Sequence, residues 1–391
     1  IGSIVALEPQ SGEVLAMVSS PSYNPNKLVG RERAENFRRL AQNPNKPLFN
    51  RTITATYPPG STFKPIMAAM ALEDSVLQSS TRIGCNMGTY VSGLRVGCHQ
   101  HKAPADLHNS IVYSCNSYYV HTFKRFLEQD RFSSVDKGYQ QWYDYLQDFG
   151  MGEPLGLDLP NEQSGNLPQA RYYDQLYGEG RWGASTIISM GIGQGEITNT
   201  TLQLANFTAA IANRGYYITP HLVDSVVQEG EMVQQSFARR DLPFDSTSIQ
   251  PVVDGMRGVV KEGTGRYYAQ VPEVKVCGKT GTAENPHGDD HSLFIAFAPK
   301  EDPQIAVAAV VENSGYGSVW AAPANSLMIE EYLTDTIKRQ WIERRLVDTS
   351  FIQEVDTSAI QSLADTPSDE SPASMPSEDT LNYTINPAAD T

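Results

Sequence analysis

The chain has 391 residues, of which 40% are hydrophobic and 9% aromatic, and its net charge is −15 from 30 basic and 45 acidic residues. This composition supports a sizeable core and excludes a collagen, a coiled coil and a wholly disordered chain. No basic stripe of the kind that binds phosphate backbones is present, which argues against nucleic acid as a partner. No apolar run approaches the ~20 residues that a membrane helix needs.

The acidic excess is concentrated at the end of the chain. Residues 347–391 contain no Lys or Arg and are rich in Ser, Asp, Pro and Thr. Such a composition cannot bury enough apolar surface to fold by itself, so we expect a disordered tail. The predicted organisation is therefore one folded domain over residues 1–346 followed by an acidic tail over residues 347–391.

The first predicted element is a β-hairpin, because residues 3–7 and 13–19 alternate in hydrophobicity around a turn that contains Pro and Gly. A helical piece is expected over residues 31–42. After a stiff Pro-Pro-Gly turn, residues 62–72 are apolar nearly all round, which is typical of a buried helix. Pro65 is compatible with that helix because it lies in the first turn.

The middle of the chain is predicted to be mainly helical and the end mainly stranded. Residues 81–108 have the composition of a loop. Apolar periodicity predicts helices over residues 109–128, 139–149 and 200–213. Strand-length apolar runs with short polar connections predict an antiparallel meander over residues 274–282, 291–298 and 304–311. A helix over residues 323–345 is expected to close the domain.

Ser61 and Lys64 form a Ser-x-x-Lys pair at the start of the predicted buried helix. Positions i and i+3 of a helix share a face, so both side chains point the same way. A serine hydroxyl becomes a nucleophile when a base removes its proton. A lysine can be that base when burial and a nearby cation lower its pKa. Alone the pair is a weak signal, because a lysine that reaches from an apolar surface to solvent is the common case.

Two further short motifs follow in the chain. A Ser-Cys-Asn motif occupies residues 114–116, and a Lys-Thr-Gly-Thr motif occupies residues 279–282 on the first strand of the predicted meander. Strand alternation places Lys279 and Gly281 on one face of that strand and the two threonines on the other. Ser-x-x-Lys, Ser-Asp-Asn and Lys-Thr-Gly together are the set shared by penicillin-binding proteins and class A β-lactamases. Here a cysteine replaces the aspartate, and we expect its side chain to point away from the cleft.

With all three motifs in this order, the chain resembles the penicilloyl-serine transferases over roughly residues 1–345. The segments that resemble elongation-type, monofunctional (class B) penicillin-binding proteins are residues 12–21, 57–65, 158–165, 191–196 and 290–294. The resemblance implies an α/β fold of the penicillin-binding protein/serine β-lactamase type. Its antiparallel five-stranded sheet, built from the opening hairpin and the closing meander, is flanked by helices and joined by a helical subdomain.

The resemblance also implies an activity, that of a D,D-transpeptidase that cross-links peptidoglycan stem peptides through an acyl-enzyme and is acylated by β-lactams. Ser61 is then the nucleophile and Lys64 the base, and the backbone N–H groups of Ser61 and Thr282 form the oxyanion hole. The other implied residues are Ser114 as proton relay, Asn116 as a ligand of the substrate amide and of Lys64, Lys279 as the cation near Lys64, and Thr280, Gly281 and Thr282 in substrate binding.

By the same resemblance, catalysis needs no cofactor, and a membrane glycosyltransferase of the elongation machinery is a partner. The implied location is the periplasm, with the full-length protein anchored in the bacterial inner membrane. The chain opens on Ile1 inside a strand-like run. We therefore expect an upstream anchor and a non-catalytic pedestal that this chain does not include.

Cys85, Cys98, His101 and Cys115 are candidate metal ligands. Cys98-x-x-His101 has ligand spacing, and three thiolates with one imidazole form a closed structural zinc set. The resemblance adds weight, because elongation-type penicillin-binding proteins can carry zinc near this place. The open alternatives are a Cys85–Cys98 disulfide, free thiols, and His99 or His108 as the imidazole ligand.

Three other functions stay open at this point. A serine β-lactamase or β-lactam sensor has the same motifs, but class A hydrolysis needs a positioned glutamate, and Glu153 and Glu162 lie in the wrong sequence context. A D,D-carboxypeptidase transfers the acyl group to water. A catalytically inactive cell-wall scaffold belongs to a different class, and the complete motif set argues against it.

Overall fold

The computed structural model describes residues 1–286 and 288–349. These residues belong to one folded unit that begins at Ile1. The predicted acidic tail lies outside the described residues from position 350 onward. Within the described part of the chain, no helix is long and apolar enough to cross a membrane.

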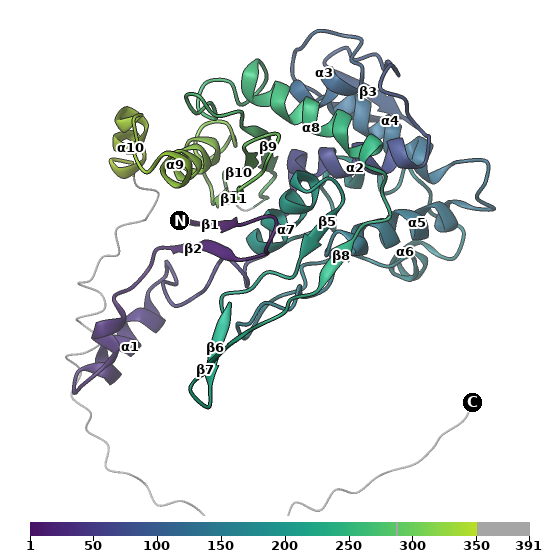
Figure 1. Cartoon of the computed structure of the whole chain (residues 1–391). Helices are drawn as coiled ribbons and strands as arrows, with labels where there is room; N and C mark the ends of the chain where they lie inside the picture. Colours follow the sequence, from purple (N-terminus) through teal and green to yellow (C-terminus); the bar gives the residue numbers. More distant parts are fainter. Residues whose placement is uncertain (287, 350–391) are drawn as a thin grey trace, which may run out of the picture. The chain divides into compact units, whose positions relative to one another are not determined.

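The secondary structure follows the chain as drawn in Figure 1. The strands are β1 Gly2–Leu7, β2 Val14–Ser20, β3 Gly88–Val91, β4 Leu94–Gly97, β5 Tyr216–Ile218, β6 Ser225–Gln228, β7 Glu231–Gln234, β8 Arg239–Asp241, β9 Cys277–Ala283, β10 His291–Ala298 and β11 Ile305–Val311. The α-helices are α1 Arg33–Gln42, α2 Lys64–Glu73, α3 Leu107–Val112, α4 Asn116–Leu127, α5 Val135–Asp148, α6 Ala170–Tyr177, α7 Thr201–Ala212, α8 Ser246–Lys261, α9 Ala321–Thr334 and α10 Gln340–Val347. Short 3-10 helices are η1 Pro25–Leu28, η2 Gly60–Phe63 and η3 Ile188–Ile192.

The main sheet has five antiparallel strands in the order β2-β1-β11-β10-β9. Strand β1 pairs with β11, from Gly2 opposite Val311 to Leu7 opposite Ala306, and so joins the opening hairpin to the closing meander. The predicted fold class and the origin of its strands are confirmed. Strand β9, which carries the Lys-Thr-Gly-Thr motif, lies at one edge of this sheet.

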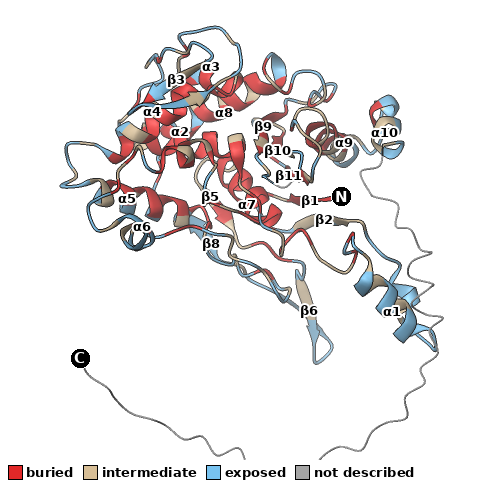
Figure 2. Ribbon diagram, turned by 180° about the vertical axis from the view of Figure 1, so that it is seen from behind, coloured by how far each residue is buried: buried red, intermediate tan, exposed pale blue. Residues whose placement is uncertain are grey.

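Helices cover both faces of the sheet, and the alternation of side chains explains why. Val5 and Ile295 pack into one core cluster with α2 and α7, whereas Ala6 and Phe294 pack into a second cluster with α9. Helix α2 is enclosed along most of its length, because every residue from Lys64 to Ala71 is buried. Figure 2 shows this buried layer of helices beside the sheet. Full burial of each large apolar side chain contributes about 1.5–3 kcal/mol.

The structure corrects two predicted helices. The predicted helix over residues 109–128 is broken, because α3 ends before Ser114 and α4 begins after it, and Ser114 has a left-handed φ of +55° that no helix accommodates. The predicted helix over residues 323–345 is also two helices, α9 and α10, since Asp335 adopts a φ of +50° at the end of α9.

Helix α8 and the hairpin β3–β4 were not predicted from the sequence. The signal for α8 was present, because Asp245 caps the helix and Ile249, Val252, Val253 and Met256 recur at helical spacing. An interior proline at position 251 obscured that pattern. Hairpin β3–β4 lies within the stretch predicted to be a loop, and its alternation is too short to detect.

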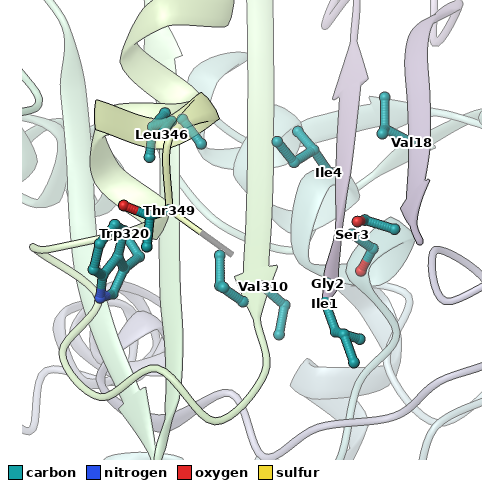
Figure 3. Close-up of a pocket in the computed structure, with 12 residues that line it drawn as sticks. Ile1, Gly2, Ser3, Ile4, Val18, Val310, Trp320, Leu346 and Thr349 are labelled. Atoms are coloured by element: carbon teal, nitrogen blue, oxygen red, sulfur yellow. The ribbon is translucent and has the colours of Figure 1, made fainter. Parts of the chain in front are cut away.

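A largely apolar cavity of ≈ 290 Å³ lies on the α9 side of the sheet, between β1, β11 and the last two helices (Figure 3). Ile4, Val18 and Trp320 are among its lining residues. None of the residues of the three motifs lines it. The cavity is therefore separate from the residues predicted to carry the chemistry.

Candidate active site

Ser61 is positioned by a tight approach of two backbone segments, the turn of η2 and strand β9. It lies in η2, one turn before α2, and its side chain is half-buried. The preceding residue, Gly60, has a φ of +52°, and a Cβ atom there would lie 2.4 Å from the carbonyl oxygen of Thr282. Glycine is therefore required at position 60, because only without a side chain can the turn carrying Ser61 contact strand β9.

Lys64 is fully buried and contacts Ser114 and Asn116 of the second motif. Its Nζ donates to the carbonyl oxygen of Ser114 (2.8 Å) and to Oδ1 of Asn116 (2.6 Å), and it lies 3.1 Å from Oγ of Ser114. Burial lowers the pKa of Lys64 to about 8, against an opposing electrostatic effect of Cys98 and Cys115. A lysine with that pKa is partly a free base near neutral pH.

Lys279 reaches the same hydroxyl from strand β9. Its Nζ lies 2.9 Å from Oγ of Ser114 and 3.0 Å from the carbonyl oxygen of Thr280, and the side chain is fully buried. Burial, and next the charge of Lys64, lower the pKa of Lys279 well below its usual range. Two amines around one oxygen favour a single shared charge, so the pair titrates as a unit.

The hydrogen-bond donors and acceptors of this cluster can form a connected path for a proton. Carbonyl oxygens only accept, so the two carbonyl contacts of Lys64 use two of its N–H bonds. The lone pair of a neutral Lys64 amine is then free to accept a proton, while a charged Lys279 donates to the hydroxyl of Ser114. The break between α3 and α4 makes this possible, because the left-handed backbone of Ser114 turns both its carbonyl and its hydroxyl toward Lys64.

The third motif lies along the free edge of the sheet. The side of β9 that carries Gly281 faces η2, since a Cβ at Gly281 would lie 2.7 Å from Cγ2 of Thr62. The hydroxyl of Thr280 bonds to that of Thr264 (2.6 Å), and the carbonyl oxygen of Thr282 accepts from Nε2 of Gln194 (3.1 Å). The predicted division of the strand into two faces agrees with these contacts.

Sequence reasoning assigned no role to two residues that contact this site, Thr264 and Gln194. Thr264 follows α8, an element that was not predicted, so nothing placed it near strand β9. Gln194 lies within the segment 191–196, which resembles the family. No residue of that segment was assigned a role. The structure thus joins Lys64, Ser114, Asn116 and Lys279 in one hydrogen-bonded cluster, places the turn that carries Ser61 against strand β9, and adds two neighbours.

The cysteine cluster lies directly behind the second motif. Cys85, Cys98, His101 and Cys115 place their ligand atoms within 4.8 Å of one another, and all four cysteines of the chain are free thiols. The structure therefore does not contain the Cys85–Cys98 disulfide that the sequence left open. Cys115 is buried, and its sulfur belongs to this cluster.

The donor set fits a structural zinc ion. Nδ1 of His101 contacts the carbonyl oxygen of Lys102 (2.9 Å), which fixes the hydrogen on Nδ1 and leaves Nε2, 3.5 Å from Sγ of Cys98, free as a ligand. Three thiolates and one imidazole complete a tetrahedral set. The cluster also holds the loop that carries Ser114 and Asn116. The backbone N–H of Asn116 donates to Sγ of Cys98 (3.3 Å), and the side-chain amide of Asn116 donates to the carbonyl oxygen of Gly97 (2.9 Å).

Comparison with known proteins agrees with this geometry. Residues 2–329 match the family described as the penicillin binding protein transpeptidase domain. The chain belongs to this family. It is 31% identical over 337 residues to the peptidoglycan D,D-transpeptidase MrdA of Acinetobacter baumannii, an alignment that covers 81% of this chain and 48% of the relative. The chain spans about half the length of these curated relatives.

Solved structures extend the comparison to the fold. The structure of Pseudomonas aeruginosa PBP2 in complex with WCK 5153 superposes with a TM-score of 0.73 at 30% identity, covering 87% of this chain and 73% of that one. A penicillin G acyl-enzyme complex of penicillin-binding protein A from M. tuberculosis superposes with a TM-score of 0.71 at 28% identity, covering 85% and 74%. The resemblance to the elongation-type class B proteins is confirmed.

Proposed function

We propose that residues 1–346 are the catalytic domain of a peptidoglycan D,D-transpeptidase, and that residues 347–391 are an acidic tail without a role in the chemistry. The observation that carries the proposal is the hydroxyl of Ser114 between the buried amines of Lys64 and Lys279, at 3.1 and 2.9 Å. Three motifs far apart in the sequence meet there, next to the turn that carries Ser61.

The first step is acylation. Oγ of Ser61 attacks the carbonyl carbon of the penultimate D-Ala of a stem peptide, and Nζ of Lys64 accepts the hydroxyl proton. The backbone N–H groups of Ser61 and Thr282 bind the developing oxyanion. One such donor is worth about 3–4 kcal/mol in the transition state.

The second step is release of the terminal D-Ala. The C–N bond breaks, and the hydroxyl of Ser114 passes a proton to the leaving amine and recovers one from Lys64. The acyl group stays on Ser61 as an ester. Asn116 binds the substrate amide, while Lys279, Thr280 and Thr282 hold its terminal carboxylate until it leaves.

The third step forms the cross-link. An amine of a neighbouring stem peptide loses a proton to Lys64, attacks the ester carbonyl and expels Ser61, which regains its proton. A β-lactam takes the place of the donor peptide in the first step. Its leaving nitrogen remains tethered to the acyl group, which blocks the approach of an acceptor and prolongs the adduct.

The two glutamates that could support a β-lactamase are occupied. The carboxylate of Glu162 accepts three backbone N–H groups, from residues 155, 156 and 157, at 2.7, 3.1 and 3.0 Å. Glu153 is exposed and bonds to Gln147 at 3.1 Å. This arrangement favours a long-lived penicillin adduct over rapid hydrolysis.

We also propose that Cys85, Cys98, His101 and Cys115 hold a structural zinc ion, which when bound stabilises the loop that carries Ser114 and Asn116. Residues of the chain itself carry out every catalytic step. By resemblance to its family, the full-length protein is anchored in the inner membrane, faces the periplasm and acts with a membrane glycosyltransferase.

Intact-protein mass spectrometry after incubation with penicillin tests the proposal on wild type, Ser61→Ala and Ser80→Ala, the last an exposed serine that serves as the matched control. We expect one penicillin on wild type and on Ser80→Ala, and none on a Ser61→Ala variant that retains the wild-type melting temperature. An adduct on Ser61→Ala, or none on wild type, contradicts the assignment. Rapid loss of the adduct favours a lactamase, and product analysis with stem peptides separates cross-linking from hydrolysis.

Elemental analysis tests the zinc proposal. We expect one zinc per wild-type chain and much less in Cys98→Ser, together with slower acylation by penicillin and a lower melting temperature. Cys277→Ser is the matched control, since Cys277 is buried in strand β9 and lies outside the cluster. Absence of zinc from wild type, with all four thiols titratable, rejects the metal.

A further inference from the structure

Gln194 lies outside the three motifs, on the loop that follows η3, and its side-chain amide bonds to the backbone of strand β9. We infer that Gln194 is a positioning residue for acyl transfer, because it holds the carbonyl of Thr282 and thereby aims the N–H of Thr282 at the oxyanion. This inference rests on the proposed function and assigns a role within that site.

The position of β9 at the edge of the sheet supports the first part of the inference. Strand β9 has β10 as its sheet neighbour on one side only. In an antiparallel strand, the N–H and C=O of one residue point to the same side. The carbonyl of Thr282 accepts from Gln194, across the edge that β10 does not occupy. The N–H of Thr282 therefore also points toward that free edge, where Ser61 lies.

The other carbonyl on this edge is bound in the same way. Thr280 lies two residues before Thr282, so its carbonyl points in the same direction, and it accepts from Nζ of Lys279 at 3.0 Å. A free carbonyl oxygen beside a developing oxyanion would repel it. A donor on each carbonyl offsets this repulsion and leaves the strand N–H groups as the polar atoms that face the substrate.

The loop of Gln194 is fixed relative to the nucleophile by backbone contacts. The N–H of Gly60 donates to the carbonyl of Gly193 at 2.8 Å, and a Cβ at Gly193 would lie 2.3 Å from the carbonyl oxygen of Gly60. A Cβ at Gly60 would in turn meet the carbonyl of Thr282. The loop, the nucleophile turn and β9 therefore meet backbone to backbone, and the amide of Gln194 adds a side-chain bond across that junction.

Stopped-flow acylation by penicillin tests this role. The data give the dissociation constant of the non-covalent complex and the first-order acylation constant. Gln194→Met keeps the length of the side chain and removes the donor, and Gln194→Glu replaces the donor with a negative acceptor. We expect the acylation constant to fall roughly tenfold or more in the methionine variant. This fall is expected to be smaller than the roughly 100- to 1,000-fold loss that follows removal of an oxyanion donor itself. In the glutamate variant, the acylation constant should fall further than in the methionine variant. The dissociation constant is expected to stay within about threefold.

Gln129→Met is the matched control, because Gln129 is also half-buried and its amide also donates to a backbone carbonyl, that of Phe126 at 3.0 Å. We expect wild-type acylation in this variant. Hydrolysis of the penicillin adduct passes through a second oxyanion, so its rate should fall in the Gln194 variants alongside acylation. An acylation constant of Gln194→Met equal to that of wild type overturns the inference, as does an equal fall in Gln129→Met. Failure of wild type to form an adduct instead defeats the proposed function.

Discussion

Lys64, Ser114 and Lys279 show how side-chain chemistry is set by surroundings and not by residue type. Neither lysine has exposed surface, and both amines lie within 3.1 Å of the same hydroxyl oxygen. Desolvation disfavours a charge on each amine, and mutual repulsion disfavours charges on both. A lysine in water is almost always protonated at neutral pH, whereas this pair retains a lone pair that can accept the proton of Ser61.

The pH dependence of acylation follows from this arrangement. Burial lowers the pKa of Lys64 to about 8, so the fraction of free base rises as pH rises through that value. We expect the acylation constant for penicillin to increase with pH up to about 8 and to level off above it. Stopped-flow measurements across that range check this, and a rate that falls through the same window rejects Lys64 as the base.

The same shift predicts a pH-dependent stability. The pKa of Lys64 is lowered on folding from 10.5 to about 8, so between these values the unfolded chain binds more protons than the folded one, and stability rises with pH. The destabilisation caused by burying the charged Lys64 amine is full below about pH 8 and absent above the unfolded-state pKa of 10.5. We expect wild type to gain on the order of 3 kcal/mol relative to Lys64→Met between about pH 7.5 and pH 10.5.

Urea unfolding of both proteins at the two ends of that range measures the gain. Groups outside the cluster titrate alike in both proteins and cancel in the comparison, so the difference reports on Lys64 together with Lys279, whose titration is coupled to it. A stability difference that stays constant with pH would show that Lys64 keeps its ordinary pKa in the folded protein.

At the scale of elements, glycines decide how closely η2, the loop after η3 and β9 approach one another. Gly60 combines a left-handed φ of +52° with a 2.4 Å approach of its Cβ position to Thr282. Gly30 has a similar φ of +73° but open space around it. The two positions therefore separate the cost of backbone conformation from the cost of contact.

We expect Gly60→Ala to destabilise the fold and to abolish most acylation, because the turn that carries Ser61 must move away from β9. Gly30→Ala should cost only the ~1–2 kcal/mol of a left-handed alanine and leave acylation unchanged. Thermal unfolding and penicillin labelling of both variants measure these effects. Normal labelling of a stable Gly60→Ala variant would show that the close approach is not needed.

For the molecule as a whole, a largely buried ion pair joins the segment before Ser61 to the main sheet. Nε of Arg51 donates to Oε1 of Glu312 at 2.9 Å, with side-chain exposures of 5% and 21%, and the hydroxyl of Tyr57 donates to the same oxygen at 2.7 Å. Glu312 follows the last residue of β11. The pair therefore connects the chain just before Ser61 to a strand that is more than 250 residues distant in the sequence.

We expect Glu312→Gln to destabilise the protein by roughly 2–4 kcal/mol, near the lower end of the range for a broken buried pair because Glu312 is partly exposed. Glu35→Gln is the matched control, since the Glu35–Arg39 pair on α1 is exposed and should contribute under about 1 kcal/mol. Urea unfolding of the two variants checks both values. Equal losses would mean that the Arg51 pair acts as a surface pair.

Much of this protein could be predicted because its signals are local. The alternation in β1 and β2, the apolar run of α2 and the order of the three motifs depend on neighbouring residues, and they correctly indicated the sheet, the buried helix and the family. The break at Ser114 was not predicted, because its left-handed backbone is stabilised by contacts with Lys64, 50 residues earlier in the chain.

The amino-acid sequence alone was thus sufficient to propose which residues carry the chemistry, since residue type and order determine what a nucleophile, a base and a cation can be. Only the tertiary structure favoured the predicted set of Cys85, Cys98, His101 and Cys115 over a Cys85–Cys98 disulfide, and showed that Gln194 reaches Thr282. The reason is physical. Spacing along the chain constrains neighbours within one helix or strand, whereas contacts between elements depend on how those elements pack, and packing is determined by the whole core at once.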